Sequence, residues 1–165
     1  MIKAKKTAYL AVSSALAIVL SYVESQIPVI AAVPGIKAGL ANIAVVFVLY
    51  RFGFREAVCV SFVRILLVSV MFGSVVSLAY SLSGAVLSLV AMLIAKRLGL
   101  FSVSGVSVCG AVMHNAGQIL AASLLIKTDV LKYYLPFLIA GGLVSGVIIG
   151  LISSFLIKRI KLEEF

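Results

Sequence analysis

Hydrophobic residues fill most of the chain in runs about as long as a membrane helix, and polar residues interrupt these runs at nearly regular intervals. A helix of about 20 residues crosses the hydrocarbon core of a bilayer. The pattern therefore predicts an all-α integral membrane protein with six transmembrane helices in a single membrane domain, residues 1–165. The expected spans are residues 7–23, 35–50, 56–72, 75–95, 105–126 and 133–157.

The composition supports the same fold class. Hydrophobic residues make up 64% of the chain and charged residues 12%, whereas about a quarter of a soluble domain is charged. Ten of the fourteen Lys and Arg residues fall in four clusters that a six-span arrangement places on one side. Because cytoplasmic loops are enriched in Lys and Arg, this predicts N-in and C-in topology and argues against nucleic-acid binding. The clusters are Lys3/Lys5/Lys6, Arg51/Arg55, Lys96/Arg97 and Lys158/Arg159/Lys161.

The segment PGIKAGLANI, residues 34–43, marks the expected passage from a loop into the second span. Gly35 and Gly39 leave one face of the new helix bare, so another backbone can approach closely. Lys37 is expected in the first helical turn, where the positive end of the helix dipole disfavours a cation. Asn42 follows within an apolar run. Since both polar residues cost stability there, they either pair locally or hold a ligand.

The first span contains a small-xxx-small pattern, from Ala11 to Ala15. This pattern indicates either ordinary helix packing or a docking face for another membrane subunit. The next segment, residues 24–34, carries Glu24 and Gln26 among apolar residues and is expected on the outer side. A segment this apolar is expected to fold back over the protein as a lid, because disorder requires a more polar composition.

Two further polar residues fall in the third and fourth spans. Arg64 lies near the centre of the third span, where an arginine costs roughly 2.5–3.5 kcal/mol on insertion scales. It either faces a functional pocket or is satisfied by a carbonyl or by Ser61, one turn earlier. Tyr80 lies near the outer end of the fourth span and belongs either to the interfacial aromatic belt or to a pocket wall.

The fifth span gathers three hydrogen-bonding side chains. His114 and Gln118 are four residues apart and Asn115 and Gln118 three apart, so they share one side of a helix. A lone histidine is usually a satisfied packing residue, but the cluster favours a ligand site, and Gly117 permits close approach. We expect no metal, because one histidine without a thiolate or carboxylate partner is a weak ligand set.

Glycines dominate one face of the sixth span. Gly142, Gly146 and Gly150 repeat the GxxxG spacing and predict a tight helix–helix crossing inside the monomer. Two cysteines, Cys59 and Cys109, are far apart and lack metal-ligand spacing, so we expect them to be buried, reduced and passive.

The residue inventory argues against catalysis by this chain. It contains no glycine-rich P-loop, so ATP hydrolysis is not expected. Asp129 is its single aspartate, which leaves no group of carboxylates to hold Mg²⁺ against a diphosphate. No Ser–His–acid set stands out. We therefore expect a binding protein that is not an enzyme and uses no cofactor.

Topology and depth together predict a polar pocket that opens to the outside. Two fixed cations in this pocket, Lys37 and Arg64, favour an anionic or strongly polar ligand, because unpaired buried cations are costly. Residues expected near the outer face are Glu24, Lys37, Tyr80 and Asp129. Residues expected to reach toward the middle are Asn42, Arg64, His114, Asn115 and Gln118.

Residues 34–42 (PGIKAGLAN) and 113–118 (MHNAGQ) together resemble the Gx transporter family, often labelled heptaprenyl diphosphate synthase component I. The resemblance covers nearly the whole chain. That family is similar to the S components of energy-coupling factor (ECF) vitamin transporters, which are prokaryotic six-helix membrane proteins. The resemblance implies uptake of a small polar or anionic solute, such as a vitamin or a cofactor precursor. The implied partners are a transmembrane coupling (T) subunit and two ATPase subunits.

The same resemblance implies roles for single residues. Ala11 and Ala15 match the AxxxA element that contacts the coupling subunit, and residues 24–34 match the lid loop. S components draw heavily on spans 4 to 6 for the pocket, which suits the cluster in the fifth span better than Arg64. The substrate does not carry over, because one fold serves many solutes.

Two other functions stay open at this point. One is a non-catalytic membrane accessory of a soluble heptaprenyl diphosphate synthase, or a binder of an isoprenoid or quinone-related molecule. The other is a stand-alone facilitator that needs no ATPase. The sequence does not distinguish these from the transporter subunit.

Overall fold

The structure is a computed structural model that describes residues 2–26, 39–126, 133 and 135–160. Its described part is all-helical, with no strand, and contains six helices. Their bounds are α1 (Ile2–Gln26), α2 (Asn42–Arg51), α3 (Phe54–Phe72), α4 (Val75–Leu98), α5 (Val103–Ile126) and α6 (Leu135–Arg159).

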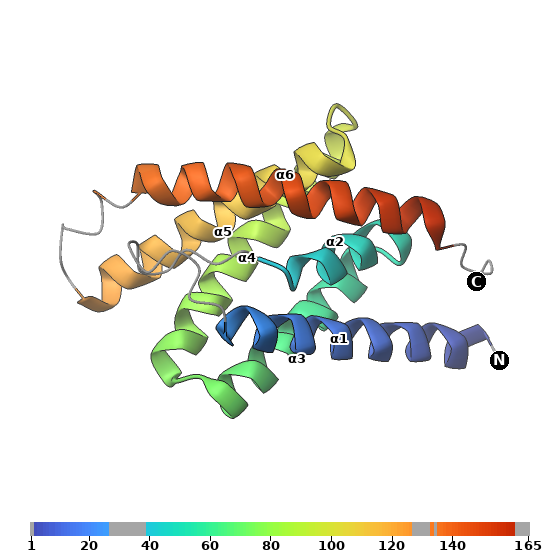
Figure 1. The fold of residues 1–165 in the computed structure, drawn as a ribbon, viewed down its shortest axis with the longest axis horizontal. Helices are drawn as coiled ribbons and strands as arrows, with labels where there is room; N and C mark the ends of the chain where they lie inside the picture. The colour runs from blue at the N-terminus through green and yellow to red at the C-terminus, as the bar shows by residue number, and fades with distance from the viewer. Residues whose placement is uncertain (1, 27–38, 127–132, 134, 161–165) are drawn as a thin grey trace.

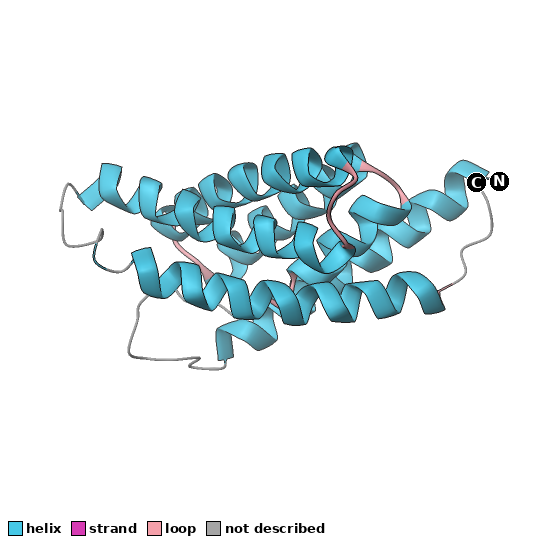
Figure 2. Ribbon diagram, turned by 90° about the horizontal axis from the view of Figure 1, so that it is seen from above, coloured by secondary structure: helices cyan, strands magenta, loops and turns pink. Residues whose placement is uncertain are grey.

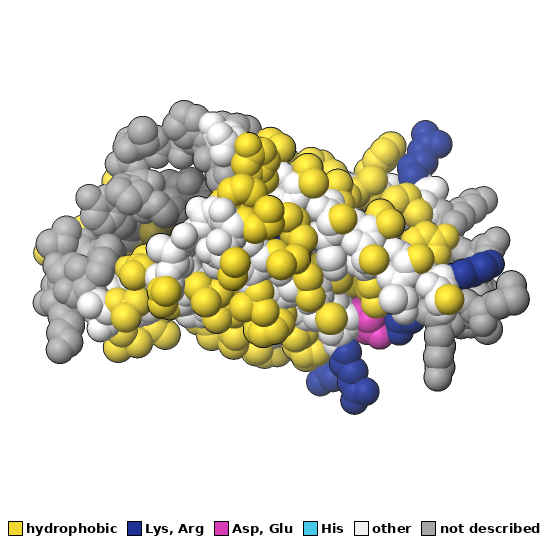
Figure 3. Space-filling model, turned by 90° about the horizontal axis from the view of Figure 1, so that it is seen from below, with side chains coloured by type: hydrophobic (Ala, Val, Ile, Leu, Met, Phe, Trp, Pro, Cys, Tyr) yellow, Lys and Arg dark blue, Asp and Glu magenta, His cyan; other side chains and the backbone are white. Residues whose placement is uncertain are grey.

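The helices form a bundle in which α2 is the central element. It packs against α1, α3 and α6. In addition, α3 packs against α4, α4 against α5 and α5 against α6. The start of α1 and the end of α6 lie at the same end of the bundle, close to the turn between α2 and α3 (Figures 1 and 2). We call this the basic end, because Lys and Arg side chains gather toward it in Figure 3 while apolar side chains predominate over the middle of that face.

The hydrophobic core is built around α2. Its sequence is apolar on every side, the pattern of a helix that is buried all round. Val48 and Leu49 are completely buried, and Val46 is 1% exposed. The buried residues of this helix are Ile43, Ala44, Val45, Val46, Val48 and Leu49.

The start of α2 corrects the expected second span. We expected a helix over residues 35–50, but α2 begins at Asn42. Gly39 has φ +75°, a left-handed conformation that cannot continue a right-handed helix. Lys37 was predicted in the first turn of this helix, but it precedes the start of α2 in the sequence. Lys37 itself lies outside the described residues, as do Asp129 and most of the expected lid, residues 27–34.

Four described helices are long and apolar enough to cross a membrane, namely α1, α4, α5 and α6. This agrees with a multi-pass membrane protein. The ten residues of α2 rise only about 15 Å, half the hydrocarbon thickness. Within α3 the charged residues Arg55, Glu56 and Arg64 lower the hydropathy.

Glycines set the close crossings of α4, α5 and α6. A Cβ atom on Gly150 would lie 2.4 Å from the Cα of Ser104, and one on Gly146 would lie 2.7 Å from the Cα of Val108. The expected tight crossing inside the monomer is confirmed. Gly117 serves α4 and α5 in the same way, because its Cβ would lie 2.6 Å from the carbonyl oxygen of Ser83.

At the basic end, three cations join neighbouring helices. Arg51 donates hydrogen bonds to the carbonyls of Ile157 and Ile160 at the end of α6. Lys96 donates to the carbonyl of Leu49, 2.7 Å away, at the end of α2. Cations are favourable at helix C-termini because they complement the dipole and satisfy the last carbonyls. These two basic residues therefore fasten helices as well as contributing to the charge pattern.

The third cation joins α1 to α3. Lys6 forms an ion pair of 2.5 Å with Glu56 in the first turn of α3. Acidic residues in a first turn are favourable because they face the positive end of the dipole.

The expectation of two buried cysteines is wrong for Cys59. It lies exposed on α3, whereas Cys109 is half-buried on α5. In a membrane protein an exposed position faces an apolar environment, so burial and lipid contact select the same residue types.

Replacing Gly150 by Ala is expected to weaken the packing of α5 and α6 by about 1–3 kcal/mol, because the new methyl group would overlap backbone. Thermal melting in detergent measures the effect. Gly105→Ala is the matched control, since its Cβ would meet only the Phe101 side chain, at 3.2 Å. Equal melting temperatures for the two variants would contradict the close crossing.

Candidate functional site

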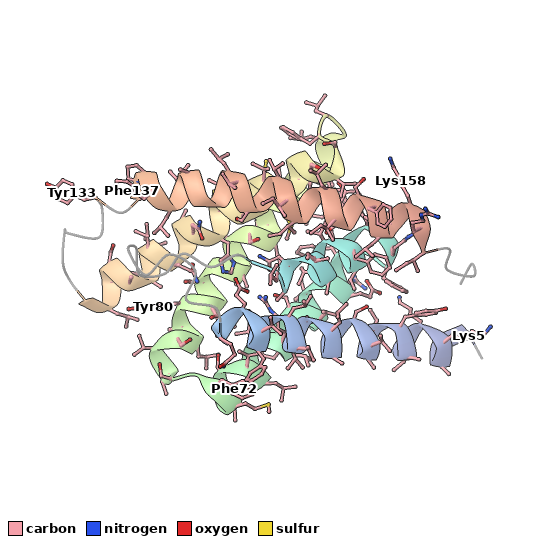
Figure 4. All side chains as sticks on the ribbon, in the orientation of Figure 1. Lys5, Phe72, Tyr80, Tyr133, Phe137 and Lys158 are labelled. Atoms are coloured by element: carbon pink, nitrogen blue, oxygen red, sulfur yellow. The ribbon has the colours of Figure 1, made fainter. Side chains whose placement is uncertain are left out.

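A cavity of about 170 Å³ lies between the helices, bounded by the ends of α1 and α3, the start of α4 and the middle of α5 and α6. Side chains or backbone of all six helices line it. Figure 4 gives the orientation, because it labels Lys5 and Lys158 at the basic end and the lining residue Phe72 away from it. The polar lining includes Ser21, Glu24, Asn42, Arg64, His114 and Asn115.

Arg64 is the most deeply placed charge in this cavity. Its side chain is 9% exposed, and its Nε is buried without a hydrogen-bond partner in the described part of the chain. Ser61, the alternative partner, is buried at 3% exposure, but no hydrogen bond joins it to Arg64 among the described residues. An unpaired buried donor is costly. The side chain is thus positioned to receive an acceptor inside the cavity.

Glu24 reaches the cavity from the last turn of α1. It was expected in the loop with Gln26, but both residues belong to the helix, and Gln26 is exposed. The Glu24 carboxylate accepts a hydrogen bond from the backbone N–H of Gly39. It also interacts electrostatically with the Arg64 guanidinium. Glu24 therefore joins the end of α1 to the approach of α2 and places a negative charge beside the cavity.

The glycine that bonds to Glu24 has a second role. A Cβ on Gly39 would lie 2.9 Å from Cδ1 of Ile149 and 3.5 Å from Nδ2 of Asn42. Its positive φ and this contact together require glycine. The turn lets Asn42, the first residue of α2, line the cavity.

The polar cluster of α5 divides between two locations. His114 and Asn115 line the cavity. Asn115 also donates a hydrogen bond of 2.6 Å from Nδ2 to the carbonyl of Leu138, which fixes its amide against α6. Gln118 does not line the cavity. Its Cγ packs against α4, where a Cβ on Gly84 would approach it to 3.0 Å.

Tyr80 is also absent from the cavity lining, although it is half-buried on α4. Five of the residues singled out in the sequence are thus brought to one cavity: Glu24, Asn42, Arg64, His114 and Asn115. Tyr80, Gln118 and Gln26 lie elsewhere. Whether any of them contacts a solute stays a prediction.

Five serines in the lining were missed by sequence reasoning. Serine is common at helix-packing positions, so none of these residues stood out singly. Ser77 and Ser81 are four apart at the beginning of α4 and share a face, but a face of small residues most simply indicates helix packing. The lining serines are Ser21, Ser69, Ser77, Ser81 and Ser145.

The cavity is suited to binding. Its described lining offers a guanidinium, a carboxylate, an imidazole, amides and hydroxyls together with apolar side chains. Among the described residues no group of three His, Cys, Asp or Glu side chains is arranged to hold a metal ion.

Arg64→Met is expected to raise the melting temperature of the ligand-free protein. Replacing an unpaired buried charge by an apolar side chain of similar length removes a desolvation cost of about 1–4 kcal/mol. The control is Arg55→Met, which changes an exposed arginine on the same helix. A lower melting temperature for Arg64→Met than for the control would assign Arg64 a structural role.

Comparison with known proteins gives one match. The profile of the heptaprenyl diphosphate synthase component I family covers residues 14–156. Neither a curated protein nor a solved structure matches the chain. The sequence-based family prediction is confirmed: this chain belongs to the heptaprenyl diphosphate synthase component I family, which is also named the Gx transporter family.

Proposed function

We propose that this protein is the solute-capturing subunit, of the S-component type, of an ECF-type transporter. It binds a small polar or anionic solute from outside the cell and delivers it for ATP-driven uptake. The observation that carries this proposal is the polar cavity with Arg64 inside it, 9% exposed and with an unpaired Nε. A buried, unsatisfied arginine in a membrane protein is a functional-site indicator.

The proposed orientation follows from the charge distribution. Lys and Arg side chains gather at one end of the bundle (Figure 3), and such residues favour the cytoplasmic side. We infer N-in and C-in topology in the cell membrane of a prokaryote, with six spans that include the short α2 and the charged α3. The cavity then opens on the outer side, where a solute arrives.

The size of the cavity bounds the solute. An engineered cavity of about 150 Å³ accommodates benzene, and this cavity measures about 170 Å³. It therefore fits a compact molecule. A flavin nucleotide, which a cation-lined pocket also suggests, is too large for the cavity in this state.

The proposed partners are a transmembrane coupling subunit and two ATPases. Support comes from α1, which uses Ser13 and Ala17 for internal packing and leaves Ala11 and Ala15 exposed. Small exposed residues let another membrane helix approach closely. The ATPases are needed because the chain carries no P-loop.

Affinity purification from native membranes in mild detergent tests the proposal. We expect recovery of a polytopic coupling subunit with two ATPases. Replacing both Ala11 and Ala15 by Leu is expected to abolish that recovery, because larger side chains separate the helices. The control is Ala140→Leu on α6, another exposed alanine. Complex formation by the double variant would contradict docking through α1.

A second candidate is an accessory role toward a soluble heptaprenyl diphosphate synthase, with binding of an isoprenoid. The family description favours it, and so does an apolar groove of about 560 Å³ between α4 and α5. The groove is lined by apolar side chains such as Val90, Ile94, Phe101 and Met113. Recovery of a prenyltransferase without ATPases would support this candidate and overturn the transporter.

The groove itself offers a direct test of the isoprenoid. Ala91→Phe is expected to fill part of it and to reduce the isoprenoid lipid retained through purification, measured by mass spectrometry.

Solute uptake by liposomes that contain this protein alone would instead indicate a stand-alone facilitator.

A further inference from the structure

Two opposite charges face the cavity without forming an ion pair with each other. Glu24 lines it from α1 and Arg64 from α3. The carboxylate is near enough to act electrostatically on the guanidinium. Among the described residues, the ion pair within 4.0 Å joins Lys6 to Glu56, and none joins Glu24 to Arg64. The cavity thus separates two complementary charges.

The separation makes both charges available to a solute. The Nε of Arg64 is buried and has no hydrogen-bond partner in the described part. Of the two carboxylate oxygens of Glu24, Oε1 accepts the N–H of Gly39, and a carboxylate has further acceptor sites. In a medium of low dielectric constant, unpaired charges are costly and charge-assisted hydrogen bonds are strong. A solute that carries both complementary charges satisfies both side chains at once.

A simple anion fits this arrangement less well. It would pair with Arg64 but bring a second negative charge close to Glu24, which is repulsive. A simple cation would pair with Glu24 but bring a second positive charge close to Arg64, which is also repulsive. The described charged lining, one guanidinium and one carboxylate beside the single histidine, is therefore matched best by a zwitterion.

The rest of the lining specifies the remainder of such a molecule. Ile65, Val68, Phe72 and Ile149 provide apolar wall on α3 and α6. A volume of about 170 Å³ leaves room for a short apolar side chain beyond the charged groups. The lining therefore combines two charge sites with an apolar wall, as recognition of a small amino acid requires.

We propose that the solute is a compact zwitterion of the amino-acid type, with its carboxylate on Arg64 and its ammonium on Glu24. This inference rests on the proposed function and names the substrate class of that same site.

Binding to the purified full-length protein in detergent tests the inference. The probes are glycine, L-alanine, L-valine and L-leucine, each compared with the acid that lacks the amino group and the amine that lacks the carboxylate. Isothermal titration calorimetry measures the affinities. At least one amino acid is expected to bind about 30-fold more tightly than either of its analogues, because each analogue leaves one buried charge unpaired.

Variants assign each charge to its group. Glu24→Gln keeps an acceptor for Gly39 but removes the charge, so it is expected to lose the preference for the amino acid over the acid. Arg64→Met is expected to abolish binding of all the probes. Glu56→Gln, at the basic end, is the control and is expected to keep the wild-type preference.

Three outcomes would overturn the inference. They are an acid that binds as tightly as its amino acid, an amine that does so, and binding of none of the probes. Recovery of the coupling subunit and ATPases does not depend on these affinities. The transporter assignment therefore survives if that complex is recovered and the zwitterion preference fails, and it falls by itself if the complex is absent.

Discussion

The structure depends on enclosing a short apolar helix whose backbone ends need partners away from water. A bilayer supplies no hydrogen bonds to exposed backbone groups, and α2 is surrounded by α1, α3 and α6. Protein groups provide partners at both of its ends. Glu24 accepts from Gly39 just before the helix, and Lys96 donates to the carbonyl of Leu49 near its end. These contacts connect α2 to α1 and α4, and the first of them also carries a cavity-lining carboxylate.

Much of the helical order was predictable because its signals are local. Apolar runs and the turns at Gly53 and Gly73 lie in the sequence, and the helices end there as expected. The start of α2 was not predictable in this way. It depends on Gly39, whose conformation is set against Ile149 and Glu24, residues distant in sequence. The exposure of Cys59 was not predictable either, because lipid-facing and buried positions are occupied by the same types of residue.

The sequence predicted several of the residues that line the candidate site, but not the directions in which their side chains point. Arg64, Asn42 and the pair His114–Asn115 are unusual at membrane depth. Their positions within apolar runs can be recognised in the sequence without a structure. Which way each points depends on helix rotation, which the glycine crossings fix through backbone contacts. Gln118 illustrates the difference, because both Gln118 and His114 pack on Gly84 but only His114 lines the cavity. The lining serines lacked any signal strong enough to separate them from packing residues.

The hydrogen bonds from Arg51 to the last carbonyls of α6 have a mechanical consequence. They hold one end of a rod of 25 residues, about 37 Å long, and Ser145 and Ile149 line the cavity near its middle. For a rod pivoting about its fixed end, displacement grows with distance from the pivot. A tilt of about 5° therefore moves the far end of a helix of this length by about 3 Å. The same tilt moves the cavity-lining residue Ser145, about half-way along α6, by about half that distance.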